Sequence, residues 1–186
     1  MRLEAHGLSI EIIPEDFRYD PRSADNLRTY DRIYRLEDPQ SSVHGLKVHQ
    51  DSALVSSAIL LAGGGASGVH AHSAIVTPQF IFLAVGDHVA CLSLPMLDLV
   101  WATQTDSATC FGVHAIPGSS DIISHGELEI ARLSDKGLII WSSSGRDIFS
   151  EGFELLPDAV KAVDFEGRTY LFDLSTGKDV SSPRVG

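Results

Sequence analysis

Four residues of this chain have the types and the spacing of metal ligands. His70 and His72 are two positions apart, so on a β-strand both side chains would point to the same face. His125 and Glu127 could add a third and a fourth ligand from a neighbouring strand. Because imidazole suits zinc, copper, nickel and iron, the sequence names these four residues as candidate ligands of a divalent transition metal. The simpler interpretation is two histidines on the solvent face of a strand, with no cofactor.

The residues before His70 resemble a known metal-binding motif. Gly64, five further residues, and His70-Ala-His72 are similar to the opening of the first motif of the cupin family. This resemblance implies a metal-dependent small-molecule binder or enzyme. It ends there, because the cupin glutamate would fall near position 76 or 77, where this chain has Val76 and Thr77, and no second cupin motif follows.

A second candidate chemistry is nucleophilic attack by a thiol. Cys110 would be a nucleophile if His114 or His125 lay beside it. No basic cluster or helix start flanks it to lower its pKa, so we expect a buried structural cysteine instead. With only Cys91 besides, the chain has no disulfide framework, although one bridge between the two remains open.

Two further patterns predict no chemistry. The glycine-rich residues 63–68 lack the Lys-Ser/Thr ending of a phosphate-binding loop and precede a strand, so we expect a hairpin turn there. Glu127 and Glu129 share a face of a predicted strand, but paired carboxylates are ordinary in so acidic a chain. The sequence therefore names no catalytic residue.

The elements that would position these residues are short β-strands in a repeated order. Between Phe80 and Val180 an apolar run, a polar turn and a second apolar run follow one another three times. Trp101 and Trp141 are 40 positions apart, and Val180 follows 39 positions later. A period of about 40 residues is typical of a four-stranded propeller blade. We expect the two indoles to pack between layers of strands.

The three stretches resemble blades of the quinoprotein-type (PQQ-like) β-propeller repeat. That family has a short strand, Leu-Asp, a Thr-Gly turn and a closing Leu-Trp. The similar residues here are Val-Ala-Cys-Leu-Ser-Leu and Leu-Val-Trp at 89–94 and 99–101, Ile-Ala-Arg-Leu-Ser-Asp-Lys-Gly-Leu-Ile-Ile-Trp at 130–141, and Tyr-Leu-Phe-Asp-Leu-Ser-Thr-Gly-Lys at 170–178. The third copy lacks the tryptophan, and the first has Pro95-Met-Leu in place of the turn. The resemblance implies fold alone, because a fold does not determine a function.

The first 79 residues show no clean copy of this pattern. A strand is predicted over 3–13, with a clear alternation from Leu8 onward, and further strands at 33–36, 45–49, 53–62 and 69–76. Residues 14–38 form a connection with a short helical turn at Ser23. Outside 14–38 and 151–158 nothing looks helical, and residues 181–186 are expected to fray. We therefore predict one all-β domain over 1–186, built of stacked antiparallel hairpins in an open roll or sandwich. The alternative is a small or partial propeller with a degenerate N-terminal blade.

Composition and charge limit the kinds of function and partner that we expect for this chain. The chain has 186 residues, 44% of them hydrophobic, and a net charge of −11, so it should fold and should repel nucleic acid and anionic membranes. The sequence shows no signal peptide and no apolar run of membrane-spanning length, and its two cysteines fit a reducing cytoplasm. The leading hypothesis is a non-enzymatic cytoplasmic module that binds another protein or itself. The alternatives are a metal-dependent binder or enzyme using His70 and His72, and a thiol activity at Cys110.

Overall fold

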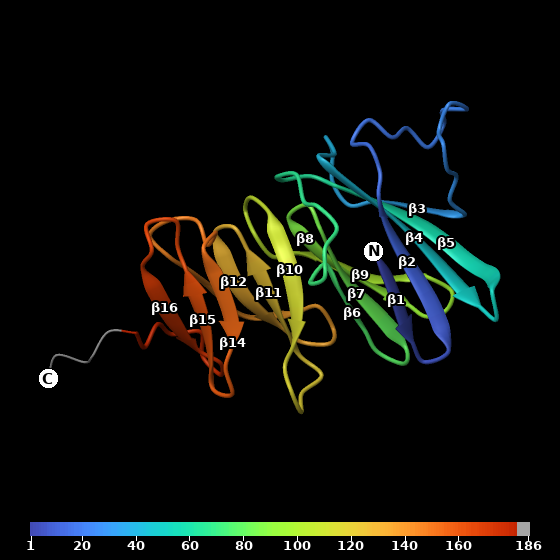
Figure 1. Ribbon diagram of the computed structural model, residues 1–186. Helices are drawn as coiled ribbons and strands as arrows, with labels where there is room; N and C mark the ends of the chain where they lie inside the picture. Colours follow the sequence, from blue (N-terminus) through green and yellow to red (C-terminus); the bar gives the residue numbers. More distant parts are fainter. Residues whose placement is uncertain (182–186) are drawn as a thin grey trace, which may run out of the picture.

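The computed structural model describes residues 1–181, and all of the regular structure in that range is β-strand (Figure 1). The first sheet has the order β1-β2-β4-β5-β3. Its strands are β1 (Arg2–Ala5), β2 (Leu8–Pro14), β3 (Arg32–Arg35), β4 (Ser42–Gln50) and β5 (Ala53–Ala62). All neighbours are antiparallel except the edge strand β3, which pairs with β5 in parallel.

The first sheet is buried on both faces at its centre. The last seven residues of β5 are buried, as its mostly apolar sequence with β-branched members predicts. One face, including Ile12 and Leu60, packs against the second sheet. The loop between β2 and β3 covers the other face, where Tyr19 and Tyr30 pack on Ile59. Both faces of this sheet are therefore covered at its centre.

The other three sheets are meanders of consecutive antiparallel strands. The second sheet contains β6 (Ala74–Val76), β7 (Phe80–Val85), β8 (His88–Ser93) and β9 (Leu99–Gln104). The third contains β10 (Cys110–Ala115), β11 (Ile122–Gly126), β12 (Glu129–Leu133) and β13 (Ile139–Ser144). The fourth contains β14 (Gly152–Leu155), β15 (Ala159–Val163) and β16 (Thr169–Asp173), and a single bridge joins β16 to Asp179.

The two tryptophans make the same contacts in neighbouring sheets. The indole N–H of Trp101 donates to the carbonyl of Asp135 at 3.0 Å, and that of Trp141 donates to the carbonyl of Leu174 at 3.0 Å. Each ring also lies against a glycine of the next sheet, Gly137 for Trp101 and Gly177 for Trp141. The indoles therefore lie between successive sheets, as their positions in the sequence predicted.

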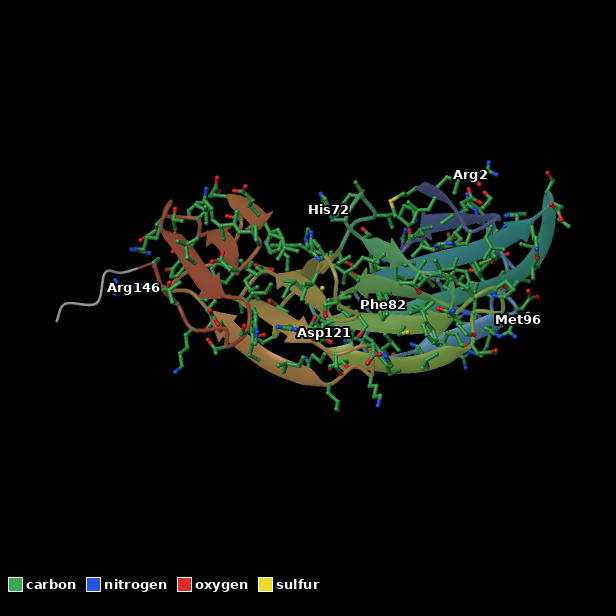
Figure 2. The ribbon with its side chains drawn as sticks, turned by 90° about the horizontal axis from the view of Figure 1, so that it is seen from below. Arg2, His72, Phe82, Met96, Asp121 and Arg146 are labelled. Atoms are coloured by element: carbon green, nitrogen blue, oxygen red, sulfur yellow. The ribbon has the colours of Figure 1, made fainter. Side chains whose placement is uncertain are left out.

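The four sheets follow one another in a curved row, and the first and fourth lie at opposite ends (Figure 1). Seen from below, the row forms an arc, and His72 lies near its inner, concave side (Figure 2). None of the sheets closes into a barrel, which confirms the predicted all-β fold of stacked hairpins. Within residues 1–181 no helix exists that is long and apolar enough to cross a membrane.

Four local predictions were wrong, and a fifth falls outside the described residues. His70 and His72 lie in a turn before β6, which begins only at residue 74, so they do not share a strand face. Residues 63–68 form no hairpin, because β5 and β6 belong to different sheets, and Gly65 N–H donates to the carbonyl of Ala108 in the loop between β9 and β10. The turn at Ser23 is not helical, and residues 151–158 contain β14. The expected fraying of the tail concerns residues 182–186, which lie outside the described range.

Candidate functional site

The predicted histidines meet in a groove of about 480 Å³ where the second, third and fourth sheets approach one another. His70 and His72 come from the turn before β6, and His125 comes from β11. A fourth histidine, His114, reaches the same groove from β10. The remaining lining residues are Phe111, Gly112, Phe153, Glu154 and Leu155.

The turn that carries His70 and His72 is fixed to β10 by its backbone. The carbonyl of His72 accepts a hydrogen bond from Val113 N–H at 2.8 Å. A side chain at Gly112 would put its Cβ 2.8 Å from the same carbonyl oxygen, so only glycine permits this approach. The imidazole Nε2 of His70 lies 2.7 Å from the carbonyl of Phe111. These contacts bring residues about 40 positions apart onto one wall of the groove.

The aromatic rings of the groove are stacked. Phe153 of the fourth sheet lies parallel to His114, with ring centres 4.1 Å apart, and to His125, with ring centres 4.6 Å apart. The ring of His72 stacks on His114 at 4.9 Å. Phe153 therefore holds His114 and His125 side by side, while His72 lies over His114 and is exposed to solvent.

Burial keeps the two inner histidines neutral. Desolvation and the neighbouring histidines lower the pKa of His114 to about 3. Desolvation also lowers the pKa of His125 to about 4, against an opposing hydrogen bond to the carbonyl of Phe149. At neutral pH both rings therefore carry a nitrogen lone pair, the form of imidazole that binds metals and accepts hydrogen bonds.

The hydrogen bonds in the groove determine which ring nitrogens offer those lone pairs. A carbonyl only accepts, so a neutral His125 donates its Nε2 proton to Phe149, at 3.4 Å, and keeps the lone pair on Nδ1. His70 likewise donates Nε2–H to Phe111 and keeps its lone pair on Nδ1. The Nε2 atom of His114 is buried and has no hydrogen-bond partner within the described residues. An unpaired buried nitrogen is costly, so this atom is the one most in need of a ligand.

Three of the four candidate ligands named from the sequence line the groove. His70, His72 and His125 line the groove, whereas Glu127 does not, because it lies in the turn between β11 and β12, where its backbone joins Thr109 and Phe149. His114 lines the groove as well, although it was not among the candidate ligands that the sequence named. No local signal marks it, since its neighbours in the groove come from three other segments.

Cys110 is buried and unsuited to attack. Its thiol contacts Ser124 Oγ at 3.2 Å, and burial raises its pKa to about 11. Cys91 is also buried, its pKa is raised to about 12, and both cysteines are free. The structural role expected for Cys110 is therefore the one that its surroundings favour.

One cluster of potential ligand atoms lies away from the groove. Atoms of Glu37, Asp87 and His88 are within 4.8 Å of one another where the first two sheets meet. The buried carboxylate of Asp87 already contacts His88 Nδ1 at 2.6 Å and accepts a hydrogen bond from Gln104 at 2.7 Å. These partners satisfy Asp87, so the cluster is explained as part of the packing between sheets.

A row of apolar side chains marks the outermost strand of each later sheet. In β9 and β13 one extra residue, Val100 or Ile140, forms a bulge directly before the tryptophan. Val180 follows the bridge residue Asp179 at the corresponding place beside β16. These three side chains, 40 positions apart, are 52%, 48% and 55% exposed. We call Val100, Ile140 and Val180 the apolar row.

Comparison with known proteins identifies the fold but no family. No protein-family model matches the sequence, and no curated protein matches it. The computationally designed Ika4 protein is similar with a TM-score of 0.50 and 9% identity, over 63% of this chain and 78% of Ika4. The computationally designed Ika8 protein has a TM-score of 0.54 and 10% identity, over 75% of this chain and 44% of Ika8.

Hydrazine synthase of Kuenenia stuttgartiensis is also similar, with a TM-score of 0.54 and 10% identity, over 80% of this chain and 47% of that one. This chain thus spans less than half the length of Ika8 and of hydrazine synthase. At such low identity the likeness concerns the arrangement of strands alone.

Proposed function

We propose that this chain is a non-enzymatic protein-interaction module that contacts another protein, or a second copy of itself, through the apolar row. The observation that carries this proposal is the recurrence of an exposed branched apolar residue at one place in three sheets. Leu138, which is 67% exposed, enlarges the apolar surface beside Ile140. Contiguous exposed apolar surface is typical of contact sites.

The partner would be held by side chains and not by strand addition. The bulges at Val100 and Ile140 distort the two edge strands, and distorted edges discourage pairing with a further strand.

The same proposal explains why the residues of the apolar row recur every 40 positions. Residues 80–180 are three copies of a repeat similar to PQQ-like propeller blades, in a partial propeller that the first sheet begins. The matching contacts of Trp101 and Trp141 support this reading. Two free cysteines fit a cytoplasmic setting, and the net charge of −11 fits a partner that is neither nucleic acid nor membrane.

The test places a photo-crosslinking amino acid at position 140 in living source cells, with an identical substitution at the exposed Glu11 as the control. We expect position 140, and not position 11, to capture one reproducible protein, which mass spectrometry identifies. A Val100→Lys substitution in the same protein should reduce the captured amount at least several-fold. A protein that stays monomeric by light scattering at all concentrations and captures nothing at position 140 refutes the proposal.

A further inference from the structure

The histidine groove is independent of the apolar row and has its own chemistry. Of the eight histidines in the chain, four line this one groove. Two of them, His114 and His125, are held side by side by the ring of Phe153. A histidine cluster of this kind is unnecessary for packing, because apolar residues would fill the same space without leaving a nitrogen unpaired.

We propose that His72, His114 and His125 form a binding site for one divalent transition-metal ion, with His70 as a positioning residue. Imidazole suits zinc, nickel, copper and iron. His114 supplies the otherwise unpaired Nε2, and His125 supplies the lone pair on Nδ1. The hydrogen bond from His125 to the carbonyl of Phe149 is the kind of outer contact that orients histidine ligands in metal sites.

The distances between the rings fit this site after a small rearrangement. Two imidazoles bound to one tetrahedral ion have ring centres about 5 Å apart, because each metal–nitrogen bond is about 2.0–2.1 Å long. His72 and His114 are separated by 4.9 Å, and His114 and His125 by 6.3 Å. The exposed ring of His72 must therefore turn from its stack on His114 toward the ion, and the ring of His125 must move closer to His114.

His70 supports the site through the backbone. It donates Nε2–H to Phe111, and its Nδ1 lies 3.3 Å from the backbone N–H of His72. These two contacts fix the turn that carries His72 against β10. Removal of His70 therefore loosens the position of one ligand without removing a ligand.

Within residues 1–181, Glu154 is the one acidic side chain that lines the groove. The charge of the ion would therefore be balanced mainly by the net negative charge of the chain as a whole.

The experiment is equilibrium dialysis of tag-free protein against Zn²⁺, followed by Cu²⁺ electron paramagnetic resonance. We expect one equivalent of zinc and a copper spectrum with nitrogen couplings. His72→Ala, His114→Ala and His125→Ala should each weaken binding at least about tenfold, and His70→Ala should weaken it less than His72→Ala.

The matched control is His6→Asn. His6 lies in a hollow with His49 at the first sheet, and its φ of 53° is one that asparagine tolerates. Zinc binding should survive this change. The exposed His72 can be replaced without disturbing the core, so His72→Ala decides the matter even if the His114 variant fails to fold. Less than a tenth of an equivalent of zinc, or equal losses in His72→Ala and His6→Asn, overturns the proposal.

Discussion

The interface between the first two sheets is built differently from the two interfaces that follow. At the first, Tyr34 donates its hydroxyl proton to the carbonyl of Leu97 at 2.9 Å and accepts from Leu99 N–H at 3.2 Å. At the later two, an indole lies on a glycine of the next sheet. Tyr34 and Leu97 are 63 positions apart in the sequence, whereas each tryptophan lies 36 positions before the glycine that it contacts.

This difference explains which interface can be recognised from the sequence. A contact that recurs at a fixed spacing leaves a period in the sequence, and the tryptophan contacts do so. The first interface occurs once, so no second copy reveals it. The comparison also predicts that the tryptophan interfaces respond alike to matched substitutions, in proportion to the burial of each indole.

Loss of an indole should have the largest effect. Trp141 is 8% exposed and belongs to the core between the third and fourth sheets, so Trp141→Ala should lower the free energy of unfolding by about 3–5 kcal/mol. Trp101 is less buried, and Trp101→Ala should cost less. Urea unfolding of both variants measures the two losses. A larger loss for Trp101 would show that the two interfaces are not equivalent.

The glycines under the indoles give a smaller and sharper test. Gly137 and Gly177 have φ of 77° and 70°, and a Cβ on either would lie 2.6 Å from the Cδ2 atom of its tryptophan. Gly137→Ala and Gly177→Ala should therefore each cost about 2–3 kcal/mol, from backbone strain and the clash together. Thermal or urea unfolding should give similar values for the two.

Gly167 is the matched control for the glycine pair. Its φ is 79°, but a Cβ there would meet no atom within 4 Å. Gly167→Ala should therefore cost only the strain of about 1 kcal/mol. If all three alanine variants lose the same stability, the contact with tryptophan contributes nothing and the comparison fails.

The sequence predicted the strands better than it predicted the site. The apolar run at 53–62 coincides with β5, because a long buried strand between clear turn residues is readable locally. The sequence did not predict that β3 is a parallel edge strand, because β3 pairs with β5 and β4 lies between these two strands in the sequence. His70 and His72 were noticed for their spacing, yet they meet His125 through a turn and not through a shared strand face.

His114 could not be found from the sequence for the same reason. Its place in the groove depends on the turn that holds His72 and on Phe153, which lies 39 positions away in another sheet. Only the packing of three sheets brings these rings together. The period of the chain predicts that sheets stack, but it does not state which side chains face one another across the stack.

Acidification should weaken the interface between the third and fourth sheets, and this is the smallest of the expected effects. The folded-state pKa values of His114 and His125 lie below the usual 6.5, so the unfolded chain binds protons at higher pH than the folded chain does. Their contribution to stability is complete above about pH 6.5 and is lost as the pH falls toward 4 and 3. Of their neighbours in the groove, His70, His72 and Glu154 can also carry charge.

The measurement compares the wild type with His114→Phe, which keeps an aromatic ring against Phe153 but cannot take a proton. Between pH 7 and pH 5 the wild type should lose on the order of 1 kcal/mol more stability in urea unfolding than the variant does, a figure reduced for the partial exposure of the ring. Both proteins share the same carboxylates, so acid titration of those groups cancels in the difference. Parallel pH profiles would mean that His114 takes up protons as readily in the folded chain as in the unfolded one, and that the groove does not hold it neutral.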